Sequence, residues 1–352
     1  MASYRVSRVA LDDVKPELLR IWNRNLTVVG TVDDRFRWTY QLAPDAWHDI
    51  FMLSAEDPRG PQLVGTAGLE VRAFASPDRE LRVALGCNLA VDAAHRTLMP
   101  GLRLVRAIRR DTPAEFDLAY HIPNELAQPL YARAGYRDLG EMIRYVRVLR
   151  HTPYVRQKID VPYLAAVVGS VVDAAAAFRH ASRRRAARER ALLWLGAFDR
   201  RFDALWIRAH STFPIVARRD AAWLSWRFSC PGSRARIAAL VDRSSPSTVC
   251  GYAIVEQLDS VAHVRDLFGP LDELDALLAL LSPALRDHGA TSASFRYLGS
   301  HDVIALLRAH GYRARDAKRR VCVELGAGLA DSERAIATTP EAWHLTEYDE
   351  DS

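Results

Sequence analysis

The sequence repeats itself weakly but in order, and this repeat constrains the fold more than any other feature. Four short segments of the first half have counterparts in the second, at offsets that drift only from 188 to 176 residues. One Gly-aromatic match is weak, whereas four matches in the same order are hard to obtain by chance. The pattern predicts an internal duplication. In chain order, the partners are 36–40 with 224–228, 63–67 with 249–253, 87–89 with 265–267, and 134–137 with 310–313.

Hydrophobic periodicity predicts the same class of structure in both copies. Alternating apolar segments, typical of strands, take turns with segments of helical spacing. Such alternation predicts α/β domains, each a mixed β-sheet flanked by helices. A chain of 352 residues is too long for one ordinary core. We therefore expect an N-terminal domain at 1–150, a helical connector at 151–195, a C-terminal domain at 196–326, and an acidic, loosely packed tail at 327–352.

The first domain can be divided into expected elements. A helix is expected from Leu11, capped by Asp12 or Asp13 and with Pro16 in its first turn. The expected strands are 4–10, 49–55, 62–74, 81–91, 116–121 and 142–149, and the other expected helices are 33–41, 103–110 and 125–134.

Composition and missing motifs exclude several classes of protein. With 49% hydrophobic and 26% charged residues, the chain is typical of a globular protein. It contains no P-loop, no GxGxxG, no HExxH and no GxSxG, which argues against nucleotide hydrolysis, dehydrogenase and esterase chemistry. Its four cysteines are far apart and form no CxxC pair, so neither a metal site nor a disulfide framework is expected. No apolar leader follows Met1, and we expect a cytoplasmic protein.

The connector combines an apolar run with a basic run. Residues 161–178 are almost wholly apolar, but Asp173 makes a bilayer span costly. Six arginines follow between 179 and 190. We expect a helix buried between the two domains; the alternative is docking of 161–190 on an anionic membrane surface, which would make the protein peripheral to a membrane. A solvated helix face is the plainer interpretation of the arginines, and an acidic protein partner is the other.

Several segments resemble the GNAT (GCN5-related N-acetyltransferase) acyltransferases, in a tandem form found with polysaccharide and lipid biosynthesis genes. The resemblance covers nearly all of the chain except 151–195, and it implies two GNAT-like domains. Its individual motifs are moderately specific. They are a strand that ends in Leu85–Val91 before a helix, the stretch from His121 through Asn124 to Tyr136, the segment 219–228, and the closing residues 342–351.

The resemblance implies an acyl-thioester co-substrate, with no permanently bound cofactor. In the family, the pantetheine arm enters between the fourth and fifth strands, and a helix N-terminus holds the pyrophosphate. The residues matched to that site are Leu89, Val91, Arg96, Gly101 and Asn124. The loop departs from the usual Arg/Gln-x-x-Gly-x-Gly/Ala signature, because Met99 replaces the first glycine and Pro100 removes one N–H donor. Asn124 has the alternative role of a helix cap.

The second copy departs further at the equivalent turn. Asp272, Glu273 and Asp275 lie where a pyrophosphate would need N–H donors, and their like charges would repel it. We therefore expect a degenerate donor loop in this half, and a role in shaping the acceptor site or stabilising the first domain.

Acyl transfer needs an acid for the leaving thiolate and a base for the attacking ammonium. Tyr131 matches the family's acid tyrosine. His121, at a strand end, and Glu70, acting through water, are the two candidates for the base. Each of the three has a plainer structural interpretation as a packed or internally paired side chain. Cys87 is expected to be a core residue.

A possible acceptor site lies in the second copy. Trp223, Trp226 and Arg227 have the i, i+3, i+4 spacing of one helix face. They are candidates for a stacking wall that holds a bulky acceptor, with Arg227 binding an anionic group. The alternative is that both tryptophans are core and that Arg227 pairs with a carboxylate.

Together these features predict an acyltransferase that moves an acyl group from a coenzyme A or acyl-carrier-protein thioester to an amine, free or linked to a lipid or sugar. One alternative is a Fem-type aminoacyl transferase, whose donor is charged tRNA and which requires a basic groove in the second half. The other is an inactive GNAT-fold binding or scaffold protein. A nucleic-acid partner is otherwise not expected.

Overall fold

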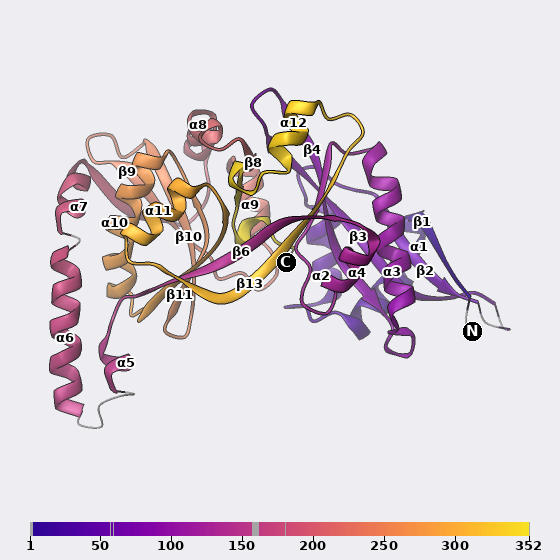
Figure 1. Cartoon of the computed structure of the whole chain (residues 1–352), viewed down its shortest axis with the longest axis horizontal. Helices are drawn as coiled ribbons and strands as arrows, with labels where there is room; N and C mark the ends of the chain where they lie inside the picture. The colour runs from indigo at the N-terminus through magenta and orange to yellow at the C-terminus, as the bar shows by residue number, and fades with distance from the viewer. Residues whose placement is uncertain (1–2, 57, 59, 157–161, 180, 352) are drawn as a thin grey trace.

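A computed structural model describes residues 3–351, except 57, 59, 157–161 and 180. Its architecture is a single mixed β-sheet that runs through both halves of the molecule, with helices packed against it (Figure 1). The strand order along the sheet is β1-β2-β3-β4-β5-β13-β6-β12-β11-β10-β9-β7, and the short strands β8 and β14 pair beside this path. The predicted α/β class is confirmed.

The expected elements of the first half are present, and most of their bounds are close to those predicted. The helix from Leu11 begins without a side-chain cap, so the expected capping by Asp12 or Asp13 is wrong. Pro16 lies in the second turn of that helix and not in the first as expected, so its ring crowds the carbonyl of Asp12 and its nitrogen cannot donate the hydrogen bond to that carbonyl. The elements are β1 (Tyr4–Ala10), α1 (Leu11–Asn25), α2 (Val32–Phe36), β2 (Asp49–Ala55), β3 (Gln62–Ala75), β4 (Glu80–Val91), α3 (Leu98–Asp111), β5 (Leu118–His121), α4 (Gln128–Ala134) and β6 (Arg137–Val148).

The second half has the same order of main elements. In both halves an antiparallel run of strands leads to a parallel pair, β4 with β5 and β11 with β12, and a helix connects the two strands of each pair. The elements are β7 (Arg190–Leu195), α8 (Arg200–Ala209), β8 (Ile215–Ala217), α9 (Ala221–Phe228), β9 (Arg236–Asp242), β10 (Val249–Leu258), β11 (Val261–Phe268), α10 (Leu271–Asp287), β12 (Ser292–Gly299), α11 (His301–Ala309) and β13 (Arg313–Leu325).

The last strands of the two halves are exchanged. β6, which ends the first half in sequence, pairs with β12 of the second half, whereas β13 pairs with β5 of the first. β6 and β13 also pair with each other, and this long ribbon crosses from one half to the other (Figure 1). The boundary expected near residue 150 therefore does not separate the two halves of the sheet. β7 also lies within the expected connector, yet it pairs with β9 and forms the edge of the sheet.

Trp38 and Trp226 join the halves at positions that the repeat placed in correspondence. Their rings stack with centroids 4.9 Å apart and 9° between their planes. Trp38 Nε1 donates to the Trp226 carbonyl at 2.7 Å, and Trp226 Nε1 donates to the Trp38 carbonyl at 2.8 Å. Each indole thus satisfies its single donor while both rings stay buried.

The expectation of a loosely packed acidic tail at 327–352 is wrong. After α12 (Asp331–Ala337), the strand β14 (Trp343–Leu345) pairs with β12 and β8, and Trp343, Leu345 and Tyr348 are fully buried. Its carboxylates can be buried because arginines pair with them. Arg219, itself fully buried, donates from Nη2 to Asp349 Oδ2 at 2.8 Å and from Nε to Asp266 Oδ2 at 3.1 Å.

The expectation of a connector helix buried between the domains is also wrong. Helix α6 (Pro162–Arg179) lies at the outer end of the second half, beside α5 (Thr152–Arg156) and α7 (Ala181–Ala186) (Figure 1). Asp173 faces inward, because its carboxylate accepts hydrogen bonds from His151 and from Arg286 Nη2 at 3.1 Å. Among the helices that the structure describes, none is long and apolar enough to cross a membrane.

Candidate active site

The strands β4 and β5 pair for only three residues and then separate. Val83–Leu85 pairs with Leu118–Tyr120 in parallel register. β5 then ends at His121, whereas β4 continues to Val91 past a break in its register with β3, where Asn88 has φ 52°. We call the place where the two strands separate the β4–β5 notch.

His121 fills this notch. A Cβ atom at position 86 would collide with its imidazole, so only Gly86 leaves room for the ring. The ring packs against Tyr131 and Tyr136 with centroids 4.7 Å away in each case. Among the described residues, neither ring nitrogen has a hydrogen-bond partner, although the side chain is 1% exposed. Desolvation lowers the pKa of His121 to about 3, so the imidazole is neutral at physiological pH.

Tyr131 lies on α4 and closes the other side of the notch. It is 5% exposed, and its ring contacts Tyr136 at a centroid distance of 5.3 Å. Burial first, and then the charge of Asp351, raise the pKa of the Tyr131 phenol. The phenol therefore stays protonated and keeps a proton that it can donate.

Glu70 lies on β3 as part of a buried ion pair. Its Oε2 accepts from Arg72 Nη2 at 2.7 Å, and its Oε1 is buried without a partner among the described residues. The Arg72 guanidinium also lies 4.9 Å from the centre of the Trp226 ring. Glu70 is thus close to the junction of the two halves, with one carboxylate oxygen still able to accept a hydrogen bond.

We did not predict Asp351 as a site residue, although the closing acidic segment was part of the family resemblance. Its side chain is exposed and lies on the wall of a cavity. Desolvation, opposed by the charge of Arg35 and reinforced by that of Glu70, raises the pKa of Asp351 to about 6. No ion pair of Asp351 occurs within the part of the chain that the structure describes.

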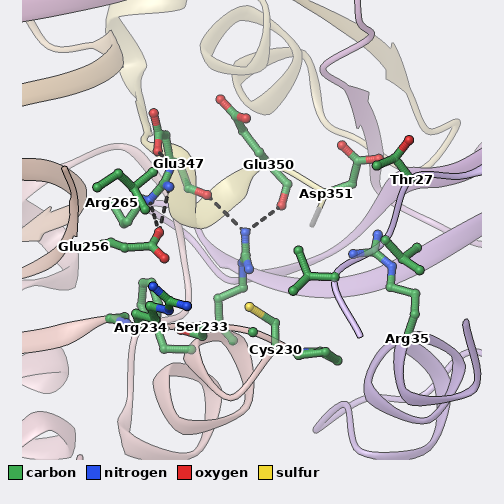
Figure 2. A pocket seen from close by; sticks show the side chains of 18 residues that line it. Thr27, Arg35, Cys230, Ser233, Arg234, Glu256, Arg265, Glu347, Glu350 and Asp351 are labelled. Atoms are coloured by element: carbon green, nitrogen blue, oxygen red, sulfur yellow. Dashed lines mark hydrogen bonds and ion pairs between the residues drawn. The ribbon is translucent and has the colours of Figure 1, made fainter. Parts of the chain in front are cut away.

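The cavity has a volume of about 550 Å³ and lies between the two halves (Figure 2). Its wall comes from the segment after α1, from the loop after α9, from β10 and β11, and from the C-terminal segment. Several charges on this wall are already paired. Arg265 binds Glu256 at 2.7 Å and also Glu347, and Glu350 accepts from Arg296 Nη1 at 3.2 Å.

Of the three residues predicted for the acceptor site, only one lies on the cavity wall. Trp223 and Trp226 are each 5% exposed and pack with Trp38, and neither lies on the cavity wall. The predicted stacking wall is therefore wrong, because both rings are buried in the junction between the halves. Arg227 does lie on the wall, but its guanidinium donates to the carbonyls of Tyr348 at 2.8 Å and of Glu350 at 3.1 Å. It therefore anchors the C-terminal segment.

The residues predicted for the donor loop lie at one end of the notch. Leu89 and Val91 belong to the part of β4 beyond its pairing with β5. Arg96 is held there, since its Nε donates to the Val91 carbonyl at 2.9 Å and its Nη2 to Asn25 Oδ1 at 2.9 Å.

Gly101 and Asn124 have structural tasks at this end. Gly101 lies within α3, not at its start, and an added Cβ would be 2.9 Å from Leu130 of α4, so the glycine allows the two helices to pack closely. Asn124 Oδ1 accepts from the Ala127 N–H at 2.9 Å and so caps the turn before α4, whose own N-cap is Ala127; the alternative role of Asn124 as a helix cap is therefore wrong.

The equivalent place in the second half is filled by the chain itself. Where β11 and β12 separate, β14 pairs with the end of β12, through Leu298 with Leu345 and Gly299 with His344. An added Cβ at Gly299 would collide with the Trp343 carbonyl. This gives a second physical reason, besides the acidic turn at 272–275, to look for a donor site only in the first half.

Solved structures share the fold of this chain, although sequence comparisons find no relative. No protein-family model matches the chain, and no curated protein is similar in sequence. A GCN5-related N-acetyltransferase from Kribbella flavida superposes with a TM-score of 0.62 at 16% identity, over 96% of this chain and 74% of that one. One from Anabaena variabilis gives 0.61 at 12% identity, over 91% and 73%. Eis1 from Mycobacterium abscessus gives 0.55 at 15% identity, over 96% and 76%.

The class follows from these likenesses and from the notch between two parallel strands. The chain has the fold of the GCN5-related N-acetyltransferases, as the sequence motifs predicted.

Proposed function

We propose that the protein is an N-acyltransferase that moves an acyl group from a phosphopantetheine thioester to an amine. The observation that carries this proposal is that the β4–β5 notch, closed by Tyr131, lies near enough to a cavity of about 550 Å³ for the charge of Asp351 on its wall to raise the pKa of the Tyr131 phenol. The fold is that of enzymes which perform this class of reaction. The notch supplies a place for the donor, and the cavity supplies one for the acceptor.

In this proposal the His121 ring that fills the notch moves aside as the donor enters. The neutral imidazole has two nitrogens without partners, and it would hydrogen-bond the amides of the pantetheine arm. Because Pro100 removes one N–H at the start of α3, the loop is poorer in donors than a usual pyrophosphate site. This favours an acyl carrier protein, whose arm has a single phosphate, as a donor beside coenzyme A.

Asp351 is the proposed base. An acceptor amine binds as an ammonium ion, and Asp351 is the carboxylate on the cavity wall that has no ion pair within the described residues. A pKa of about 6 leaves it ionised near neutral pH but basic enough to receive a proton. These properties favour Asp351 over His121, whose pKa is near 3, and over Glu70, which is bound to Arg72.

Tyr131 is the proposed acid. The amine nitrogen attacks the thioester carbonyl carbon, the carbon–sulfur bond breaks, and the departing thiolate takes the phenolic proton. The ammonium loses a first proton through Asp351 to solvent in the cavity. The nitrogen loses a second proton as the amide forms, and this proton restores the Tyr131 phenol, so that one proton is released overall.

The test combines binding with turnover. Calorimetry with coenzyme A and with an acyl-loaded carrier protein measures donor binding, and release of the free thiol in the presence of a panel of amines measures transfer. Tyr131→Phe keeps the ring, so we expect little change in the free energy of unfolding but a loss of about 100-fold in turnover at saturating donor and acceptor. Tyr154→Phe, an exposed tyrosine on α5, is the matched control.

Each outcome separates the candidate functions. Full turnover in Tyr131→Phe would reduce this tyrosine to a packing role. If neither thioester binds or reacts, the hypothesis of an inactive binding or scaffold protein is favoured. Transfer from charged tRNA alone would identify the Fem-type reaction.

A further inference from the structure

Helix α6 carries an apolar stripe that nothing in the described chain covers. Tyr163, Val167, Val171, Ala174 and Phe178 follow one another at three- or four-residue intervals and so share one side of the helix. Tyr163 is 81% exposed, Val171 is 63% exposed and Phe178 is 85% exposed. The stripe contains no charged residue. Large apolar side chains gathered on an outer surface mark a place where another apolar phase or surface binds.

The inner side of α6 is tied to the protein, so the stripe has a fixed direction. Gly169 packs so closely on α5 that an added Cβ would be 2.7 Å from the Thr152 Cα. Asp173, which lies 7% exposed on this inner side, accepts hydrogen bonds from His151 and Arg286. The exposed stripe therefore cannot turn inward without breaking these contacts, and α6 presents it at the outer end of the molecule (Figure 1).

The charge around this stripe identifies the partner. Residues 151–190 contain eight of the 48 basic residues of the chain but only three of the 43 acidic ones. This segment therefore carries a net charge of +5, which is the whole net charge of the protein, and the remainder is neutral. Arg185 on α7 and Arg188 in the turn that follows it are exposed, and neither has a carboxylate partner among the residues that the structure describes.

We propose that α6 and the adjacent arginines form a docking surface for an anionic lipid bilayer. The stripe enters the interfacial region, and the arginines contact the headgroups. A second copy of the chain is disfavoured as the occupant, because it would bring together Arg185 and Arg188 of two copies, which have no carboxylate partner among the described residues to offset them. The inference is independent of the proposed acyl transfer.

Vesicle co-sedimentation of the full chain tests this surface. We expect binding to phosphatidylcholine vesicles that contain phosphatidylglycerol, little binding to phosphatidylcholine alone, and loss of binding near ~0.5 M salt. Replacing Arg185 and Arg188 together by glutamine should weaken binding roughly 30-fold at low salt, from about 1 kcal/mol per arginine. Val171→Asp combined with Phe178→Asp should abolish binding, and both positions are exposed enough for the variant to fold.

The matched control is Ile207→Asp, which makes the same kind of change at a residue that is 71% exposed on α8. It should bind anionic vesicles like the unmodified protein. Absence of binding to anionic vesicles would overturn the proposal. So would sedimentation equilibrium showing that the α6 variants only dissociate a dimer, because a second copy would then be the true occupant.

Discussion

The candidate site contains residues that are close in sequence and one that is far from them. Tyr131 and His121 are close in sequence and could be predicted together from a strand end followed by a short helix. Asp351 lies 220 residues after Tyr131, and no local pattern distinguishes it from any other carboxylate in an acidic segment. Its position depends on Arg227, which holds three backbone carbonyls of that segment. Such a long-range contact has no periodicity to reveal it.

The pH dependence of the reaction tests the role of Asp351. Because its pKa is raised to about 6, the basic form is lost as pH falls below that value, and kcat/KM should fall about tenfold per unit there. Asp351→Asn should remove this limb and lower the rate about 100-fold. Glu347→Gln changes a carboxylate on the same cavity wall that is paired with Arg265, and it should keep the limb. An unchanged limb in Asp351→Asn would assign the base elsewhere.

At the scale of elements, the local sequence pattern predicts where strands begin and end, but it does not predict which strands pair. The strands β1 to β4 lie within about one residue of their predicted bounds, because each alternates between a buried and a more exposed face or is bounded by turn residues. The same patterns say nothing about partners, so the exchange of β6 and β13 could not be predicted. The strand β14 was missed because it is only three residues long and precedes an acidic stretch. Arg219 makes the burial of that stretch possible.

Gly86 and His121 give a prediction at this scale. Gly86→Ala adds a methyl group where the imidazole lies, so the ring must move or the two strands must separate further. We expect a loss of about 1–3 kcal/mol in the free energy of unfolding, as for other overpacked sites, together with weaker donor binding. Gly196→Ala is the matched control, since its added Cβ meets no atom within 4 Å. Denaturant unfolding and calorimetry with coenzyme A measure both effects. Equal stability of the two variants would show that the notch is not filled as described.

On the scale of the whole molecule, the exchanged strands make the two halves one mechanical unit. The sheet continues from β5 through β13 and β6 into β12, and the largest hydrophobic cluster contains residues of both halves, such as Leu85 and Leu240. The Trp38–Trp226 pair and the C-terminal segment add further contacts across the junction. The repeat in the sequence predicted two units with similar elements, but a sum of two independent domains would lack this shared core.

Thermal unfolding distinguishes one cooperative unit from two. Because neither half retains its last strand alone, we expect the body of the molecule outside α5 and α6 to unfold in one calorimetric transition, with equal calorimetric and van't Hoff enthalpies. Leu53→Ala removes a fully buried side chain from the first half, and Leu240→Ala does so in the second. Each should cost about 2–5 kcal/mol and lower the same transition. Two separate transitions, with each variant moving only one of them, would show that the exchanged strands do not couple the halves.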